Sequence, residues 1–176
     1  MRPVDLARKL RREAAFEPSA LDRGKAALMA AIRRESEPRR WPTIVPQIPY
    51  QDVTAALSFL ERAFGFREVL TARLVSSDGA IGHATLEFGS GVIGIGPEGH
   101  HGTMSPKTAG IESQYISVYV DDVDAHYQRA AAAGARIATG LRDYFWSDGG
   151  HRTYEALDPE GHRWRFHQWI REGPRS

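Results

Sequence analysis

The spacing of hydrophobic residues predicts two similar units in this chain, each built from one helix and four strands. In the first unit, Val53, Ala56, Leu57, Leu60 and Phe64 recur at helical spacing. Apolar and polar residues alternate before and after this helix, as they do in strands with one buried face. The predicted elements are a strand at 44–50, a helix at 54–64 and strands at 67–75, 81–88 and 92–95.

A second unit repeats this order with nearly the same spacing. Its predicted elements are a strand at 115–120, a helix at 124–133 and strands at 136–139, about 151–157 and 162–169. Asp52 precedes Gly65 by 13 residues, and Asp121 precedes Gly134 by 13 residues. Because repetition at a fixed spacing decides a fold more reliably than propensity, we predict an α+β fold of two βαβββ repeats, at about 43–96 and 113–169.

The last hairpin of the second repeat has a well-defined turn. Pro159 presets the backbone for the first corner, and Gly161 can adopt the left-handed conformation that closes the turn. In the strand that follows, Trp164 and Phe166 lie on one face, whereas Arg165 and His167 lie on the other.

Residues 1–42 differ from the rest in charge. They contain eleven Lys and Arg residues against six Asp and Glu residues, and two amphipathic helical patterns followed by a linker at 38–42. We therefore predict a basic helical arm at 1–42 and a folded domain at 43–176. The arm either packs its apolar stripe on this domain or a second subunit, or contacts DNA or another partner.

Composition narrows the functional classes. The chain of 176 residues has a formal net charge of +1, which argues against a protein built as a whole to bind nucleic acid. It contains no cysteine, which excludes disulfides, thiolate metal sites and cysteine nucleophiles. No apolar run approaches the length of a membrane span, and no secretory signal is visible, so we predict a cytoplasmic protein.

Several motifs resemble the vicinal-oxygen-chelate superfamily, which contains glyoxalase I, extradiol dioxygenases and bleomycin-resistance proteins. They are Tyr50-Gln51-Asp52-Val53, Ala63-Phe64-Gly65-Phe66, Val120-Asp121-Asp122-Val123, Ala133-Gly134-Ala135 and Asp158-Pro159-Glu160-Gly161-His162. The resemblance covers roughly residues 43–169. It implies two βαβββ modules that curl into an incomplete barrel around a cavity, and association into a homodimer.

Metal-using members of that superfamily bind a divalent ion through four strand positions, which the resemblance places at Val45, Gly94, Tyr115 and Arg165. None of these is a usual ligand, and a guanidinium repels a cation. We therefore predict no family metal site and no cofactor. His100, His101, His151 and Glu155 stay open as an unconventional metal site.

Strand alternation predicts which side chains line the cavity. The polar and aromatic residues expected to face inward are Gln47, His83, Thr85, Glu87, Tyr115, Ser117, Tyr119, Arg165 and His167. Arg165 either contacts a carboxylate or phosphate of a ligand or forms an internal ion pair with Glu87. His83 is either a catalytic base or a hydrogen-bonded structural histidine.

The segment 143–150 connects two predicted strands and contains three consecutive aromatic residues before a polar turn. It resembles the loop of the bleomycin- and mitomycin-resistance-like branch, in which aromatic side chains at the cavity mouth stack on a flat ligand. Phe145 and Trp146 are therefore predicted ligand contacts; alternatively, they fill a hydrophobic gap beneath the loop.

These observations favour metal-independent binding of a small, planar organic molecule, with resistance by sequestration as the most specific hypothesis. One alternative is a lyase, isomerase or dioxygenase-like enzyme that uses His83 or Glu87 as general base, or the unconventional metal site. Another alternative is a ligand-sensing regulatory protein that acts through the basic arm. The predicted partners are a small-molecule ligand and a second copy of the chain.

Overall fold

The computed structural model describes residues 23–25, 41–146 and 149–170. The chain divides into two compact units, residues 1–40 and 41–176. Of the arm predicted at 1–42, the structure describes residues 23–25, which are helical, and residues 41–42; the rest lies outside the described residues. Within the part that the structure describes, no helix is long and apolar enough to cross a membrane.

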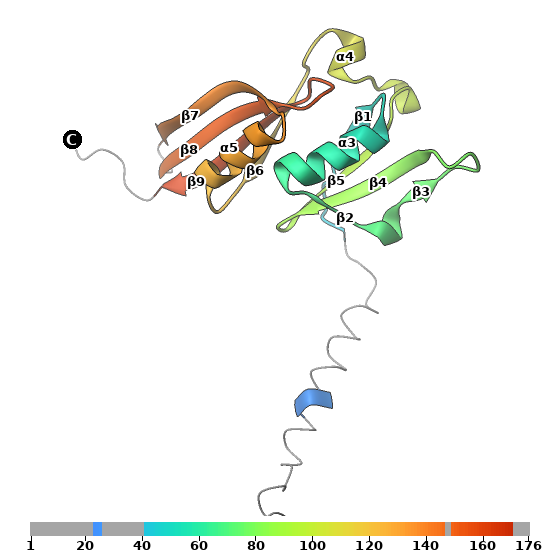
Figure 1. The fold of residues 1–176 in the computed structure, drawn as a ribbon, viewed down its shortest axis with the longest axis horizontal. Helices are drawn as coiled ribbons and strands as arrows, with labels where there is room; N and C mark the ends of the chain where they lie inside the picture. The colour runs from blue at the N-terminus through green and yellow to red at the C-terminus, as the bar shows by residue number, and fades with distance from the viewer. Residues whose placement is uncertain (1–22, 26–40, 147–148, 171–176) are drawn as a thin grey trace, which may run out of the picture. The chain divides into compact units, whose positions relative to one another are not determined.

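The first module contains one mixed sheet covered by a helix (Figure 1). Its elements are β1 (Gln47–Tyr50), α3 (Val53–Phe59), the π-helical turn η1 (Leu60–Phe64), β2 (Arg67–Glu68), the 3₁₀ turn η2 (Leu70–Ala72), β3 (Leu74–Val75), β4 (Ile81–Phe88) and β5 (Gly91–Pro97). The strand order is β1-β5-β4-β2, and β3 also pairs with β4. The strand predicted at 67–75 is therefore interrupted by η2. Leu70 is 72% exposed, so no buried face holds this segment in the sheet.

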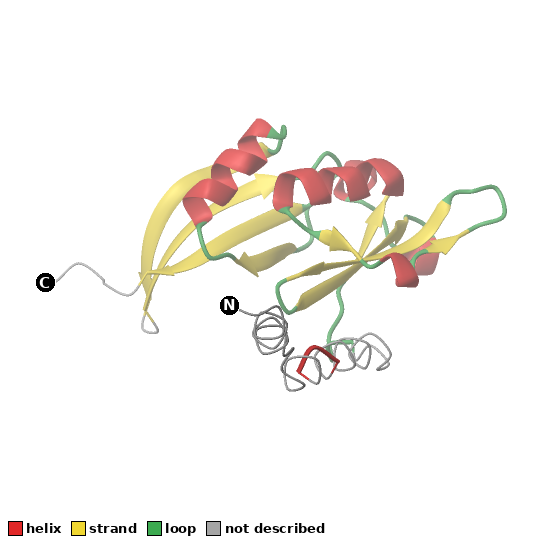
Figure 2. Cartoon of the chain, turned by 60° about the horizontal axis from the view of Figure 1, so that its bottom comes forward, coloured by secondary structure: helices red, strands yellow, loops and turns green. Residues whose placement is uncertain are grey.

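The second module repeats the topology of the first. The connection contains η3 (His100–Gly102) and α4 (Pro106–Ala109), and the module contains β6 (Tyr115–Tyr119), α5 (Val123–Ala132), β7 (Arg136–Trp146), β8 (Gly149–Leu157) and β9 (Arg163–Ile170). The order β6-β9-β8-β7 matches that of the first sheet, which confirms the α+β fold and the predicted repeat. Figures 1 and 2 show both helices on one side of the two sheets, which are not closed into a barrel.

The predicted aromatic loop is instead part of a hairpin. Strand β7 continues to Trp146, and β8 begins at Gly149, so residues 143–146 pair with residues 149–152. The Asp and Gly residues at 148–150 suggested a longer connection, but the aromatic residues before them favour extended backbone. The prediction of a loop at 143–150 was therefore wrong.

Both long helices begin at an aspartate cap and end near a left-handed glycine. The side chains of Asp52 and Asp122 accept hydrogen bonds from the backbone N–H of Ala55 and Ala125, each at 2.9 Å. In the second module the capping residue is Asp122, one position after Asp121, from which the spacing of the second repeat was counted. Gly65 has φ +76°, and a Cβ atom there would lie 2.7 Å from an Arg129 guanidinium nitrogen. Glycine thus allows both the turn and the close approach of Arg129.

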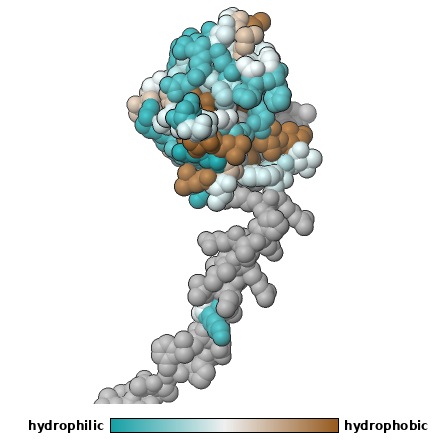
Figure 3. All heavy atoms as spheres, turned by 90° about the vertical axis from the view of Figure 1, so that its right-hand side faces the viewer, coloured by the Kyte–Doolittle hydropathy of each residue, from teal (hydrophilic) through white to brown (hydrophobic). Residues whose placement is uncertain are grey.

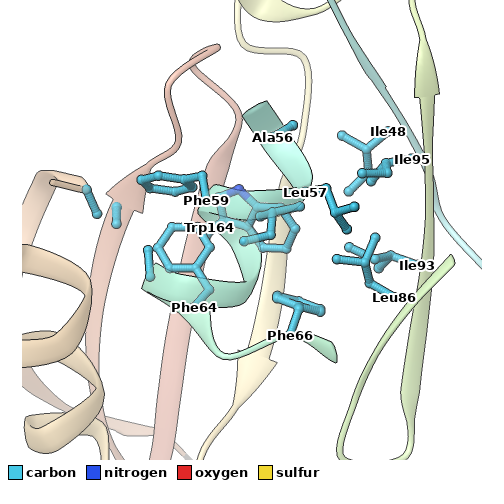
Figure 4. Close-up of a cluster of buried hydrophobic side chains, with 14 of the residues drawn as sticks. Ile48, Ala56, Leu57, Phe59, Phe64, Phe66, Leu86, Ile93, Ile95 and Trp164 are labelled. Carbon is cyan, nitrogen blue, oxygen red and sulfur yellow. The ribbon is translucent and has the colours of Figure 1, made fainter. Parts of the chain in front are cut away.

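One hydrophobic core extends across both modules (Figure 4). The rings of Phe64 and Phe66, at the end of the first helix, lie 5.5 and 5.4 Å from Trp164 of β9. Phe64 also lies 4.9 Å from Phe166. All four rings are at most 5% exposed, so the end of the first helix is part of the core of the second module.

The turn between β8 and β9 connects the modules through Asp158, which is 4% exposed. Its carboxylate accepts hydrogen bonds from the Tyr50 hydroxyl at 2.7 Å and from the Trp164 indole at 3.1 Å. The backbone N–H groups of Glu160 and His162 donate to its other oxygen, each at 3.0 Å. Burial, reinforced by Asp158, raises the pKa of Tyr50 well above its ordinary value, so this hydroxyl stays a donor.

Glu160 and His162 continue this connection toward the first helix. The Glu160 carboxylate accepts hydrogen bonds from the backbone N–H of Gln51 at 2.7 Å and of Asp52 at 2.9 Å. The His162 imidazole donates to the Pro49 carbonyl at 2.8 Å. The last hairpin of the chain therefore satisfies backbone groups just before the first long helix.

A second connection joins the two helices. His126 of α5 donates from Nε2 to the Phe64 carbonyl at 3.0 Å, because a carbonyl can only accept. Its Nδ1 then accepts from the Tyr154 hydroxyl at 2.6 Å. Arg129 donates to the carbonyls of Ala63 and Phe64, each at 3.3 Å. Burial, reinforced by Arg129, lowers the pKa of His126 to about 4.

The first module also exposes apolar side chains beside its sheet. Leu70, Leu74 and Val75, of η2 and β3, are 72%, 65% and 55% exposed. Figure 3 views the molecule from the right-hand side of Figure 1 and shows hydrophobic residues gathered among hydrophilic ones. These side chains lie within one short segment, and grouped exposed apolar residues mark contact surfaces more often than single ones do.

Candidate functional site

Each sheet has one face covered by its helix and an opposite face, here called the helix-free face. On the second sheet, Tyr154, Trp164 and Phe166 pack in the core. Strand alternation places their neighbours on the helix-free face. The residues that share it across the four strands are Tyr115, Ser117, Tyr119, Arg163, Arg165, His167, Trp169, His151, Thr153, Glu155, Arg142 and Tyr144.

Aromatic rings form a stack at one end of this face. The Tyr119 ring is nearly parallel to the rings of His167 (25°, centroids 5.2 Å apart) and Trp169 (15°, 5.7 Å). His151 lies 4.0 Å from Trp169 by ring centroids. Tyr119 and Trp169 are about half exposed, whereas His151 and His167 are buried. The stack therefore presents two open aromatic surfaces above two buried imidazoles.

Charged residues occupy the other half of the face. Glu155 of β8 accepts from Arg165 at 2.8 Å and from Arg163 at 2.7 Å. Burial opposes ionisation of Glu155, but these hydrogen bonds hold its pKa below the ordinary value. The Arg165 guanidinium also lies over the Tyr115 ring, 4.7 Å from its centroid. Arg165 is therefore paired with Glu155 and not with Glu87, which was one of the two alternatives considered. Glu87 pairs with Arg67.

Two buried polar atoms between these halves have no hydrogen-bond partner among the described residues: Thr153 Oγ1 and His167 Nδ1. The two residues face each other across β8 and β9 and are 4% and 5% exposed. Arg142 lies beside Thr153 on β7 and is exposed, and its side chain has no hydrogen bond or ion pair with a described residue. Burial, with Arg165 and His151, lowers the pKa of His167, so its ring is neutral at pH 7.

The predicted residues of the first module lie on the helix-free face of the other sheet. The His83 ring is hydrogen-bonded to the Thr85 hydroxyl at 3.0 Å, as expected of a structural histidine. Gln47 pairs with Gly94, where an added Cβ atom would lie 2.2 Å from the Gln47 amide oxygen. The glycine therefore leaves room for Gln47. A hollow of about 280 Å³ beside Gln47 and His83 is also lined by His100 and His101.

The predicted site residues thus form two groups on two sheets. Gln47, His83, Thr85 and Glu87 belong to the first sheet, and Tyr115, Ser117, Tyr119, Arg165 and His167 belong to the second. Phe145 pairs with Gly150 and approaches Ile170, on the face opposite to Tyr144. Phe145 therefore does not join the aromatic stack. The side chain of Trp146 lies outside the described part of the chain.

Comparison with known proteins identifies the family. The model of the glyoxalase/bleomycin resistance protein/dioxygenase superfamily matches residues 43–166. The chain belongs to this superfamily. An uncharacterised protein of Mycobacterium bovis is 33% identical over 135 residues, which cover 74% of this chain and 86% of that protein.

Solved structures of the superfamily show the same fold. TioX from Micromonospora sp. ML1 is 36% identical, with a TM-score of 0.60 over 73% of this chain and 99% of TioX. The fosfomycin resistance protein FosX of Listeria monocytogenes is 15% identical, with a TM-score of 0.54 over 75% of this chain and 96% of FosX. The latter similarity concerns the fold alone.

The four positions that hold a metal ion in metal-using members of this superfamily do not suit one here. Gly94 has no side chain, and the Gln47 amide lies across it. Arg165 holds a positive charge between Glu155 and Tyr115. In residues 41–146 and 149–170, no group of three or more His, Cys, Asp or Glu side chains is arranged to hold an ion. The residues present therefore do not fit the family metal.

Sequence reasoning missed several residues of the helix-free face. Glu155 was considered only as a metal ligand, and Trp169, Thr153 and Arg142 were not considered for the site. Each lies beside a predicted residue only because of the pairing between β7, β8 and β9. The alternation of His151, Thr153 and Glu155 could have indicated a shared face once β8 was extended to Gly149.

Proposed function

We propose that this chain binds a small, planar organic molecule on the helix-free face of the second sheet, without a metal ion. In this proposal the molecule is a toxic metabolite or antibiotic, and binding confers resistance by sequestration. Sequestration requires shape, stacking and a few polar contacts, but no catalytic group. The membership of a superfamily that includes bleomycin resistance proteins supports this class of function.

The observation that carries the proposal is the aromatic stack of Tyr119, His167 and Trp169. The Tyr119 and Trp169 rings are 52% and 51% exposed, although aromatic rings of this size contribute most when they are covered. A flat ligand laid on these rings would extend the stack and remove apolar surface from water. Because the rings are already nearly parallel, little side-chain entropy is lost on binding.

The polar atoms beside the stack support an oriented ligand. Thr153 Oγ1 and His167 Nδ1 are buried and lack a hydrogen-bond partner among the described residues, a state that is costly unless another group satisfies it. A polar edge of a planar ligand could hydrogen-bond to them after a small movement of the side chains above. Arg142 at the margin would favour an acceptor or negative group on that edge.

Replacing Trp169 by Ala is expected to weaken binding of flat polar aromatic molecules by about tenfold, because one stacking surface is removed. The measurement is a thermal-shift screen with acridine, riboflavin and related compounds, followed by calorimetric titration of those that raise the melting temperature. Phe145→Ala is the matched control, because Phe145 is an aromatic residue that is 44% exposed on the opposite face of the same sheet. A screen without any thermal shift, or equal affinities for both variants, would contradict the proposal.

We also propose that two copies of the chain associate. Leu70, Leu74 and Val75 are exposed apolar side chains that a second copy would cover. We expect sedimentation equilibrium to give twice the chain mass of 19.6 kDa. Leu74→Glu should shift the protein toward the monomer. A monomeric wild-type protein at micromolar concentration would contradict this proposal.

A further inference from the structure

A hollow of about 810 Å³ lies at the junction of α4 with the end of the second sheet. The turn between β8 and β9 and the first residues of β7 complete its walls, beside α4 in Figure 1. Pro106 lies against Gly161, where an added Cβ atom would be 3.3 Å away, and the Lys107 N–H donates to the Glu160 carbonyl at 2.9 Å. The hollow is thus bounded by segments that contact one another and has the volume of a ligand site.

The acidic side chains around the hollow are already engaged. Glu112 pairs with Arg163. The Asp158 carboxylate accepts from Tyr50 and Trp164, and the Glu160 carboxylate accepts from two backbone N–H groups of the first module. Asp158 and Glu160 are buried, and their oxygens face the junction between the modules. These carboxylates therefore offer little to a cation in the hollow.

Two basic side chains of the hollow are not engaged. Lys107 of α4 and Arg136 of β7 line it from different elements, and both are exposed. Neither side chain has a hydrogen bond or an ion pair with any residue that the structure describes. Arg163 lies at the boundary with the helix-free face, but its guanidinium is divided between Glu112 and Glu155. The positive charge available to a ligand therefore comes from Lys107 and Arg136.

The remaining walls are apolar. Ile111 is 67% exposed although it lines the hollow, and Leu157, Pro106 and Pro159 contribute further apolar surface. A hydrated inorganic ion would leave this surface in water. A molecule with an apolar body and one negative group would cover the apolar walls and place its charge near Lys107 and Arg136.

We propose that this hollow binds an organic carboxylate with an apolar body, held by Arg136 and Lys107. The site is separate from the aromatic stack and does not depend on the function proposed for it. A ligand here would contact the turn that connects the modules, so its binding should also raise the stability of the folded chain.

The test compares cyclohexanecarboxylate with cyclohexanecarboxamide, which has nearly the same shape but no charge. Both are saturated, so neither can stack on the rings of the helix-free face. The amide signals of Gly110, Gly134 and Gly161, which line the hollow, report binding in ¹H–¹⁵N NMR titrations of the full chain. We expect the carboxylate to shift these three signals and to bind at least tenfold more tightly than the amide.

The variant R136Q/K107Q is expected to lose at least tenfold in affinity for the carboxylate. Arg62→Gln is the matched control, because Arg62 is exposed on η1, away from the hollow, and it should bind like the wild type. Equal affinities for carboxylate and amide, or an unchanged affinity of the double variant, would overturn the proposal. If inorganic phosphate at the same concentration shifts the three glycine signals, the proposal that the ligand needs an organic, apolar body would be overturned. If planar aromatic compounds bind but the carboxylate does not, the proposal for the hollow fails and the function proposed above stands.

Discussion

Replacing Asp158 by Ala should lower the free energy of unfolding by about 4 kcal/mol, the largest effect that we expect of a single substitution. The carboxylate accepts four hydrogen bonds, from Tyr50, Trp164 and two backbone N–H groups. Its removal leaves these donors without an acceptor, and each buried donor left without a partner costs about 1–3 kcal/mol. Urea unfolding of both proteins at pH 7 measures the difference.

The control for this substitution is Asp121→Ala. Asp121 is exposed and precedes the capping residue of α5, so its loss should change stability by less than about 0.5 kcal/mol. Tyr50→Phe removes one of the four donors together with its need for an acceptor. It should therefore destabilise the protein much less than Asp158→Ala does. Similar values for the aspartate variant and its control would show that the turn does not hold the modules together.

The second large expected effect is a loss of folding stability at acidic pH. Burial holds the pKa of His126 at about 4, whereas the unfolded chain has an ordinary histidine pKa near 6.5. Below pH 6.5 the unfolded state therefore takes up a proton that the folded state does not. The stabilisation is complete above pH 6.5 and is lost as the pH falls toward 4, by about 1.4 kcal/mol per pH unit.

Substituting Gln for His126 should remove this pH dependence. Between pH 6.5 and 5, the wild type is expected to lose about 2 kcal/mol more than the variant in urea unfolding. His167, whose pKa burial also lowers, contributes a smaller change of the same sign that both proteins keep. Parallel pH profiles for the wild type and the His126 variant would disprove the assignment.

Local patterns were sufficient to predict the architecture. The helical spacing from Val53 to Phe64, the aspartate caps and the glycines at 65 and 134 each specify an element through neighbouring residues. Strand β4 was predicted at its observed bounds because Ile81 to Phe88 alternates regularly. Errors occurred where local signals competed, as at 143–150, where turn residues follow three residues with high strand propensity.

The candidate site depended on information that the sequence does not contain locally. The sequence offered Glu87 as an ion-pair partner for Arg165, and only the pairing of β8 with β9 places Glu155 beside it. The position of Phe145 on the opposite face follows from the length of β7 and not from its aromatic character. Polar networks between strands require the register, which is set by the whole sheet.

The turn at 158–162 has a consequence for how the two repeats depend on each other. The equivalent turn of the first repeat, Gly89-Ser90-Gly91, has no carboxylate, so it cannot accept hydrogen bonds as Asp158 and Glu160 accept them from the first repeat. Tyr50 and Asp158 are 108 positions apart. During synthesis, the first repeat can complete its hydrogen bonds only after the last hairpin has left the ribosome. We therefore expect the duplicated halves to fold as one cooperative unit, and the first half expressed alone to remain incompletely folded.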